Sequence, residues 1–271
     1  MSYLRELRVA VEELEKGNPV ALVIVTKKIG SAPRDVGARM VVRVDGSVVG
    51  TLGGGVFERM IVEEALRALR EGRSRAKRYA FREEASREAE KTGLICGGET
   101  EVFIDVLKPA PRLLIVGAGH LAQSIARVAS EVGFRIAVTD RDEGHANHER
   151  FPMAEKIVVD EPERGVEKLG PREGDLLVIV YGGVEEDYRA LLKALETPVR
   201  YIGLLGSRRK CQEFLRRLRE RGYREEELRG RLYMPLGLDI GADSPEEIAV
   251  AAVAELISVL RGGKLRHLSI V

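Results

Sequence analysis

The sequence predicts an α/β protein made of an N-terminal α+β domain followed by a Rossmann-like, doubly wound parallel-sheet domain. Three observations support this fold class. A glycine turn, Gly117-Ala118-Gly119, stands between a strand pattern and a helix pattern. Strand and helix patterns alternate after it, which is typical of a parallel sheet with right-handed crossovers. Two prolines in "KPAPR" (108–112) interrupt helix and sheet, so we expect domains at 1–108 and 112–271.

The first half combines helix and strand signals. Hydrophobic residues at helical spacing predict an amphipathic helix that ends at Gly17-Asn18-Pro19. Asp45-Gly46 lies between two valine-rich stretches and predicts a hairpin. Further strands are expected at 20–26, 76–81 and 100–107, and a second helix at 56–71. The charged segment 82–92 has no clear pattern.

The second half alternates regularly. Expected strands are 113–116, 135–140, 156–160, 176–181 and 199–205, and expected helices are 120–132, 162–169, 184–196 and 207–221. The sequence predicts a final helix that begins after Ser244 as N-cap, with Pro245 in the first turn and Glu247 three residues after the cap. These residues predict a capping box.

Composition excludes several classes of protein. The 271 residues carry a formal charge of +1, which argues against electrostatic binding of nucleic acid. No apolar run reaches the length of a membrane span, and the N-terminus lacks a signal pattern, so we expect a cytoplasmic protein without a membrane partner. Many charged residues with few Asn and Gln favour a thermophilic source.

The clearest motif is the turn Gly117-Ala118-Gly119-His120. Its glycines allow a diphosphate to approach the N-terminus of the following helix. Asp140 ends the next strand, where the ribose-binding acid of a dinucleotide fold belongs. The turn therefore predicts a nucleotide site for NAD(P) or another nucleotide, although many Rossmann-like domains bind other ligands. His120 either faces a ligand or packs.

A second glycine turn lies in "YIGLLGSRRK" (201–210). Gly206 precedes Ser207, Arg208, Arg209 and Lys210, which open a helix. Cations are unfavourable at a helix N-terminus unless something negative compensates them, so this turn predicts an anion site. The alternative is a solvated first turn.

A third turn, Gly53-Gly54-Gly55, precedes the helix at 56–71. Upstream, "GSAPRDVGARM" (30–40) supplies Ser31, Arg34 and Arg39 on a glycine-rich loop. Together they predict a pocket for an anionic ligand. The alternative is a tight bend at which two backbones cross.

Cys96 is followed by Gly97 and Gly98 in "LICGGETEV", where backbone N–H groups are expected to stabilise a thiolate. A lone cysteine is more often a small buried hydrophobe, and Cys211 within an amphipathic helix is expected to be one. His145 and His148 have a spacing compatible with a metal, but no third ligand is evident.

The ordered set "GSAPRDVGARMVV", "GTLGGGVFE", "LICGGE", "IVGAGHLAQ", "YIGLLGSRRK" and "PLGLDIGADSPEEIAVAAVAELI" resembles the XdhC/CoxI family of accessory proteins for molybdenum hydroxylases such as xanthine dehydrogenase. The resemblance implies a chaperone that binds molybdenum cofactor, as molybdopterin or its dinucleotide form. It also implies help with sulfuration and insertion of the cofactor. The implied partners are an apo molybdenum hydroxylase and a cysteine desulfurase. Under the resemblance, the Cys96 thiolate is a candidate ligand of the molybdenum.

The sequence also allows expectations about the assembly of the protein and about competing functions. A cofactor shielded from water favours a site closed by two protomers, so we expect a homodimer. The competing function is an NAD(P)-dependent oxidoreductase that uses the Rossmann domain. The rest of the chain has no recognisable hydride-transfer site, which argues against this function. A third hypothesis, an enzyme that acts on the cofactor itself, lacks a nucleotidyltransferase loop or a pyridoxal-binding lysine motif.

Overall fold

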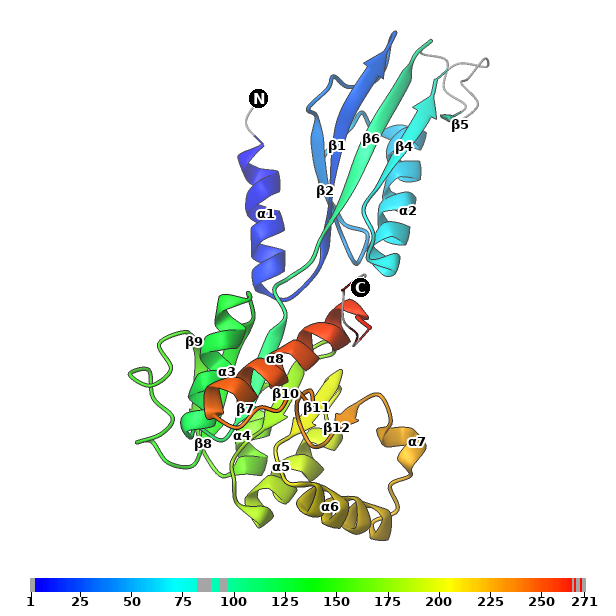
Figure 1. Ribbon diagram of the computed structural model, residues 1–271. Coiled ribbons are helices and arrows are strands. Elements are labelled where there is room, and N and C mark those ends of the chain that lie inside the picture. Colours follow the sequence, from blue (N-terminus) through cyan, green and yellow to red (C-terminus); the bar gives the residue numbers. More distant parts are fainter. Residues whose placement is uncertain (1–2, 82–88, 93–96, 265, 267–268, 270–271) are drawn as a thin grey trace. The chain divides into compact units, whose positions relative to one another are not determined.

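The computed structural model describes residues 3–81, 89–92, 97–264, 266 and 269 (Figure 1). The chain divides into two compact units, Met1–Ala110 and Pro111–Val271. The units meet in the proline-containing segment "KPAPR", and each is described by itself.

The first unit is built on a six-stranded sheet with the order β3-β2-β1-β6-β4-β5. Its strands are β1 (Val20–Ile29), β2 (Arg39–Arg43), β3 (Val48–Gly50), β4 (Arg75–Ala80), β5 (Ala89–Lys91) and β6 (Glu99–Leu107). The long strands β1 and β6 pair antiparallel at its centre, and β4 and β5 are parallel. The predicted hairpin at Asp45-Gly46 is confirmed, since β2 and β3 pair antiparallel on either side of it.

Two helices pack on this sheet. Helix α2 (Gly55–Glu71) buries Phe57 and Ile61 against inward-facing strand residues such as Tyr79. Helix α1 (Leu4–Glu15) instead packs through Ala10 against Val20 and Val41. The apolar residues that predict α1 are largely not the ones that it buries, because Leu4, Leu7 and Val11 are 61%, 41% and 52% exposed.

The second unit contains six parallel strands in the order β12-β11-β10-β7-β8-β9. They are β7 (Arg112–Val116), β8 (Arg135–Asp140), β9 (Ala154–Val159), β10 (Leu176–Ile179), β11 (Tyr201–Leu204) and β12 (Leu232–Tyr233). The chain runs outward from β7 in one direction, then returns to β10 and runs outward in the other. This order is that of a doubly wound Rossmann sheet, so the predicted fold class is confirmed, and its topological switch point lies between β7 and β10.

Helices cover both faces of this sheet. Helices α3 (His120–Glu131) and α8 (Pro245–Arg261) share one core, whereas α4 (Pro162–Leu169), α5 (Val184–Leu195) and α6 (Arg208–Glu220) share the other. The predicted capping box of α8 is confirmed, since Ser244 and Glu247 satisfy each other's backbone N–H groups. Helix α7 (Glu225–Leu228) and strand β12 are too short for a periodic pattern.

The length and hydropathy of the described helices decide whether any of them could span a lipid bilayer. Within residues 3–81, 89–92 and 97–264, no helix is both long and apolar enough to cross a membrane.

A buried ion pair anchors the loop that follows β10. Asp187 is fully buried and accepts hydrogen bonds from the backbone N–H groups of Tyr181 and Gly182. The Lys210 ammonium, from the first turn of α6, also donates to Asp187. Burial raises the pKa of Asp187, and the contact with Lys210 opposes that effect. The pair therefore fixes the switch-point loop to α6.

We predict that Lys210→Met destabilises the protein by about 3–5 kcal/mol, because it leaves the Asp187 carboxylate buried without a counter-charge. Urea unfolding followed by circular dichroism measures the change. The matched control is Lys193→Met, which removes surface ion pairs with Glu167 and Glu196 and should cost about 0–1 kcal/mol. Equal losses for the two variants would contradict a structural role for the buried pair.

Candidate functional site

Three motifs of the first unit meet at loop 30–38, between β1 and β2. A Cβ atom at Gly53 would lie 2.3 Å from the Cβ of Pro33. A Cβ atom at Gly98 would lie 2.2 Å from the carbonyl oxygen of Ser31. Both glycines thus allow neighbouring segments to approach more closely than any side chain permits. At Gly53 the structure thus shows a close approach to Pro33, as the tight-bend alternative expects, and ligand binding by the turn stays a prediction.

The triple-glycine turn encloses a carboxylate of its own helix. The Glu58 Oε2 atom accepts the N–H groups of Leu52 at 2.9 Å and Gly54 at 3.1 Å. It also accepts the Thr51 hydroxyl at 2.6 Å. Gly54 and Gly55 have φ of 75° and 67°, with open space around the position of a Cβ atom, so backbone conformation rather than crowding requires glycine there. The turn is an anion-binding nest whose anion is Glu58.

The charge of Glu58 is stabilised by this arrangement. Partial burial acts to raise its pKa, but the hydrogen bonds from Thr51, Leu52 and Gly54 and the charge of Arg34 act to lower it. The net direction is downward from the ordinary value of 4.5. Ligand binding by the N–H groups of this turn, as expected from the sequence, therefore has an internal competitor at Leu52 and Gly54.

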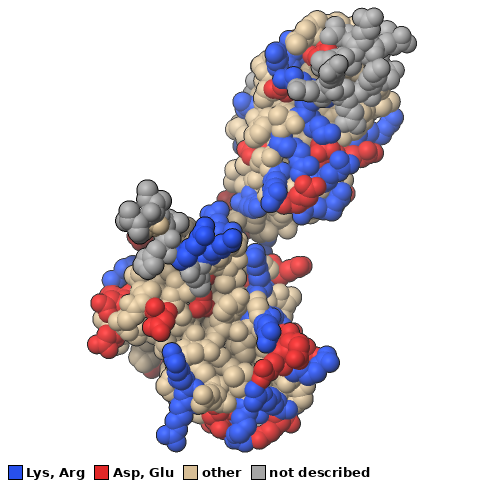
Figure 2. All heavy atoms as spheres, turned by 45° about the vertical axis from the view of Figure 1, so that its right-hand side comes forward, with Lys and Arg blue, Asp and Glu red and all other residues tan. Residues whose placement is uncertain are grey.

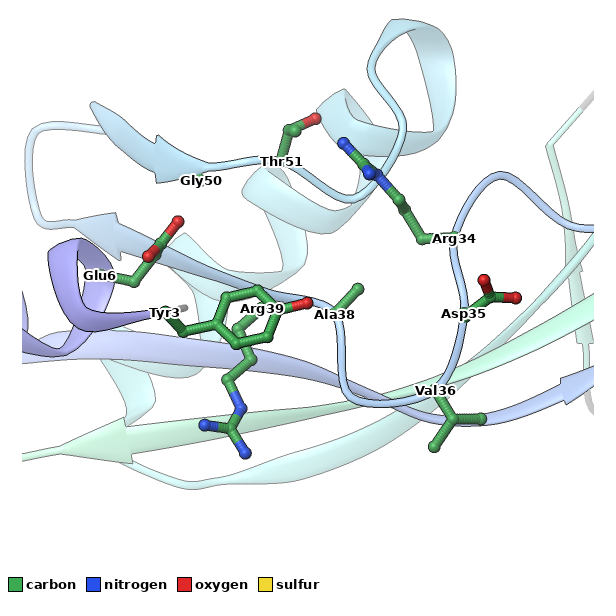
Figure 3. A pocket seen from close by; sticks show the side chains of 9 residues that line it. All are labelled: Tyr3, Glu6, Arg34, Asp35, Val36, Ala38, Arg39, Gly50 and Thr51. Atoms are coloured by element: carbon green, nitrogen blue, oxygen red, sulfur yellow. The ribbon is translucent and has the colours of Figure 1, made fainter. Parts of the chain in front are cut away.

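A cavity of about 340 Å³ opens beside this loop (Figure 3). It is lined by Tyr3, Glu6, Arg34, Asp35, Val36, Ala38, Arg39, Gly50 and Thr51. Arg34 extends toward Thr51, whereas Arg39 passes behind the Tyr3 ring and turns its guanidinium away from Arg34 (Figure 3). The two predicted arginines thus border one cavity without converging on a single point. Ser31 is exposed and contributes its carbonyl to the contact with Gly98.

The charges around the cavity are only partly neutralised. Asp35 pairs with Lys28 at 2.7 Å. Arg34 makes no ion pair or hydrogen bond with any residue that the structure describes, and neither does the guanidinium of Arg39, which lies 5.4 Å from the centre of the Tyr3 ring. On the visible face of the molecule, Lys and Arg side chains intermingle with Asp and Glu (Figure 2). The cavity therefore combines cations without carboxylate partners in the described chain with a polar lining.

Cys96, expected to be a thiolate, lies outside the described residues. Its neighbour Gly97 donates its N–H to the carbonyl of Phe81 at 2.8 Å, and Gly98 accepts from the N–H of Phe81 at 2.8 Å. The expectation that the Gly97 N–H is available to a thiolate is therefore wrong, because β-type pairing with Phe81 uses it.

In the second unit, the glycine turn lies at the switch point of the sheet. Gly117 has φ of 101°, and a Cβ atom there would lie 2.6 Å from the Cα of Tyr181. Gly119 caps α3 and has open space around it, and His120 is exposed in the first turn. The geometry thus keeps the helix N-terminus accessible, as a phosphate site requires.

Asp140 is used within the protein. Its carboxylate accepts the N–H of Ala118 at 2.7 Å, the N–H of Asp142 at 3.1 Å and the hydroxyl of Tyr181 at 3.1 Å. The residue is 6% exposed. Burial, together with the charge of Asp140, raises the pKa of Tyr181 to about 12, so this tyrosine remains a hydrogen-bond donor. Three of about four acceptor positions of the carboxylate are occupied, which leaves little capacity to bind a ribose.

Sequence reasoning missed Arg150, which follows Asp140 in an irregular loop. Its guanidinium donates to the carbonyl of Ala118 at 3.4 Å and to Gln123 at 3.1 Å. Its Nε atom is enclosed and has no hydrogen-bond partner among the described residues. No periodicity or motif marks such a residue, because the loop alone brings it to the glycine turn.

The second predicted anion site, at α6, is largely occupied by its own side chains. The Ser207 hydroxyl accepts the N–H of Lys210 at 3.3 Å, and the Lys210 ammonium is paired with Asp187. Gly206 lies against the Lys210 side chain. Arg208 and Arg209 are exposed, with Arg208 3.9 Å from Asp239. Lys210 therefore does not serve as a third cation for a ligand, and the solvated-turn alternative fits the two arginines.

The remaining candidates have simpler outcomes. The expected packing role of Cys211 is confirmed: this residue of α6 is 4% exposed in the core, and burial raises the pKa of its thiol. His145 and His148 are exposed, and His145 lies 3.4 Å from Asp142. Across the described ranges, no group of three His, Cys, Asp or Glu side chains could hold a metal ion.

The fold and site define a protein that joins an arginine- and glycine-rich antiparallel unit to a Rossmann unit. The family model for the XdhC Rossmann domain matches residues 113–256, and that for the XdhC and CoxI family matches residues 13–80. The chain therefore belongs to the XdhC and CoxI family.

Several relatives support this membership. The chain is 42% identical over 249 residues to the Escherichia coli uncharacterized protein YqeB, covering 91% of this chain and 45% of that protein. It is 32% identical to a Bacillus subtilis protein described as a probable subunit of xanthine dehydrogenase, covering 58% of this chain and 46% of that protein. The chain thus spans about half the length of these two relatives.

Two further matches extend over both units. The Escherichia coli molybdenum cofactor insertion chaperone PaoD is 29% identical, covering 93% of this chain and 87% of that protein. A crystal structure of a xanthine dehydrogenase from Bacillus halodurans superimposes with a TM-score of 0.53 at 25% identity. It covers 94% of this chain and 97% of that one.

We predict that Glu58→Gln destabilises the protein by about 1–2 kcal/mol at neutral pH, because an amide oxygen accepts the three hydrogen bonds more weakly than a carboxylate. The folded-state pKa of Glu58 lies below its ordinary value of 4.5. Its contribution is therefore present above that value and is lost as the pH falls through the lower folded pKa. Urea unfolding between neutral and acidic pH should show the difference between wild type and variant shrinking below 4.5.

The control for this series is Glu63→Gln, an exposed residue of the same helix. It should leave both the stability and its pH dependence unchanged. A constant difference between wild type and Glu58→Gln at every pH would show that the glycine turn does not depend on the charge of Glu58.

Proposed function

We propose that this chain is an accessory protein of a molybdenum hydroxylase, which binds molybdenum cofactor, protects it and assists its insertion into the apo enzyme. Family membership supports an accessory role. One relative, which this chain matches over most of its length, is a molybdenum cofactor insertion chaperone. Another relative is a probable xanthine dehydrogenase subunit. The proposal includes assistance with sulfuration of the cofactor, for which the partner is a cysteine desulfurase. It also includes xanthine dehydrogenase as the hydroxylase that receives the cofactor.

The observation that carries the proposal is the cavity at loop 30–38. Arg34 and Arg39 border it and have no carboxylate partner in the described chain. Molybdopterin carries a phosphate, and arginine is the side chain best suited to bind one. The residues present therefore fit the anionic end of the cofactor. We assign Arg34 to this end and Arg39 to the border of the same cavity, with Gly53 and Gly98 holding the loop that carries Arg34.

The Rossmann turn is proposed as a separate nucleotide site of the second unit. Gly119 and the N-terminus of α3 are open to an anion, and the Arg150 guanidinium lies beside the turn. Binding of NAD(P) at the same turn stays a prediction. The three hydrogen bonds that Asp140 already accepts argue against its use as the ribose-binding acid of an oxidoreductase.

We predict that Arg34→Ala weakens cofactor uptake by about tenfold to a hundredfold, the size expected for a charge-assisted hydrogen bond to phosphate. Purified protein is titrated with molybdopterin under anaerobic conditions, and bound cofactor is measured after gel filtration. Arg59→Ala is the control, because Arg59 is an exposed cation on α2 outside the cavity.

The same preparations test the wider proposal. Wild type loaded with cofactor should activate an apo xanthine dehydrogenase, with higher activity when a cysteine desulfurase and cysteine are added. If wild-type protein shows no saturable uptake of molybdopterin, the proposed function is wrong. Light scattering on the loaded protein tests the proposed homodimer, and the mass of a single chain would contradict it.

Cys96 remains a proposed ligand of the molybdenum or participant in sulfur handling. It precedes Gly97-Gly98 in the sequence, and Gly98 contacts loop 30–38. We predict that iodoacetamide at neutral pH modifies Cys96 faster than the buried Cys211, and that bound cofactor slows only the first reaction. Peptide mass spectrometry measures both rates in one chain.

The substitution Cys96→Ser should weaken retention of the cofactor with little change in stability, since the two side chains are similar in size. Labelling of Cys96 at the same rate with and without cofactor, together with normal retention by Cys96→Ser, would reduce this residue to a structural role.

A further inference from the structure

The cavity of the first unit also contains an acceptor that the proposed phosphate does not use. Glu6, in the first turn of α1, lines it, and the Oε2 atom of Glu6 is enclosed without a hydrogen-bond partner among the described residues. The Nε atom of Arg39 is enclosed in the same way. Leaving such a group unpaired costs about 1–3 kcal/mol, so a ligand gains affinity if Glu6 rotates to turn this oxygen into the cavity and accepts its N–H groups.

The strand next to Glu6 is shaped to admit its carboxylate. A Cβ atom at Gly50, the last residue of β3, would lie 3.0 Å from both Cγ and Oε1 of Glu6 and 2.7 Å from the carbonyl of Arg39. Glycine is unfavourable within a strand, because it loses much conformational entropy and contributes no packing. At Gly50 the backbone φ of 89° favours glycine, and the absence of a Cβ atom also leaves the space in which the Glu6 carboxylate lies.

The two ends of the cavity differ in chemistry. Glu6 points toward the Gly50 side, and Arg34 extends to Thr51 from the opposite loop (Figure 3). Between them lies the ring of Tyr3, beside Arg39. A ligand that satisfies all three needs adjacent N–H donors at one end, a flat ring in the middle and an anion at the other. The volume of about 340 Å³ is that of a site for a small ligand.

We propose that Glu6 binds the 2-amino-4-oxopyrimidine edge of a pterin or guanine, while Arg34 binds the anionic group attached to it. The amino group and the adjacent ring N–H of this edge are parallel donors, which a carboxylate accepts as a bidentate pair. Adenine presents a donor beside an acceptor and does not match. This inference rests on the proposed function, because molybdopterin contains a pterin and a phosphate, and it adds the residue that selects the ring.

The test compares three probes on the full-length protein by calorimetry: pterin-6-carboxylate, guanosine monophosphate and adenosine monophosphate. Wild type should bind at least one of the first two at least tenfold more tightly than the adenine nucleotide, because a site built for paired donors rejects a ligand that lacks them. The tighter of the two identifies the source of the ring, a pterin or a guanine nucleotide.

Glu6→Gln should abolish this preference, since an amide offers one donor and one acceptor and suits adenine better. Glu12→Gln, an exposed acid on the same helix, should retain it. Because Glu6 has no hydrogen-bond partner in the described chain, its variant should keep the thermal midpoint of wild type, and Glu6→Ala provides a second variant for the same comparison.

The outcomes separate this inference from the proposed function. Equal binding of all three probes to wild type, or an unchanged preference in Glu6→Gln and Glu6→Ala, would overturn the role of Glu6. Wild-type uptake of molybdopterin that both Glu6 variants retain in full would leave the accessory function standing without it. If the protein prefers guanine in a Glu6-dependent way but takes up no molybdopterin, the result would support the ring-binding role of Glu6. It would contradict the proposed accessory function.

Discussion

The candidate site depends on the close backbone contacts on either side of loop 30–38. Gly53 lets the triple-glycine turn reach Pro33, and Gly98 lets the segment after Cys96 reach the carbonyl of Ser31. Neither contact leaves room for a Cβ atom, so a larger residue at either position has to move the loop. The loop carries Arg34 and leads into Arg39. The position of Arg34 therefore depends on these two contacts, whereas Arg39 is positioned by the pairing of β2 with β1.

Glycine turns at helix N-termini expose backbone N–H groups that need an acceptor, and this protein supplies acceptors of its own. Glu58 fills the triple-glycine turn, Asp140 accepts the Ala118 N–H of the Rossmann turn, and Ser207 caps α6. Each internal acceptor fixes a loop before any ligand arrives. A site that is already organised loses less conformational entropy on binding, so these internal acceptors shape the loops rather than contact a ligand.

The fold was largely predictable because its signals are local and repeated. Alternating strands and helices after "KPAPR", the capping box of Ser244 and Glu247, and the Asp45-Gly46 hairpin all depend on residues within a few positions of one another. The site was predictable only in part. A glycine turn beside arginines indicates an anion, but whether that anion is a ligand or Glu58 depends on side-chain geometry that one sequence does not contain. For the same reason Lys210, expected as a ligand-binding cation, is instead the partner of the buried Asp187.

Helix α1 shows why Glu6 escaped sequence reasoning. Leu4, Leu7 and Val11 mark its apolar face, yet the face that packs on the sheet carries Ala10 together with the half-buried Glu6. An apolar pattern directs attention to one side of a helix and treats an acid on another side as solvated. The short Ala10 side chain lets the helix approach β2, and Gly50 leaves space where the carboxylate arrives. A charged residue is thereby enclosed on a helix that packs Val9, Ala10 and Leu14 on the sheet and leaves Leu4, Leu7 and Val11 exposed. An enclosed acid adds nothing to the apolar packing of the helix, and its position fits the ligand-binding role proposed for Glu6.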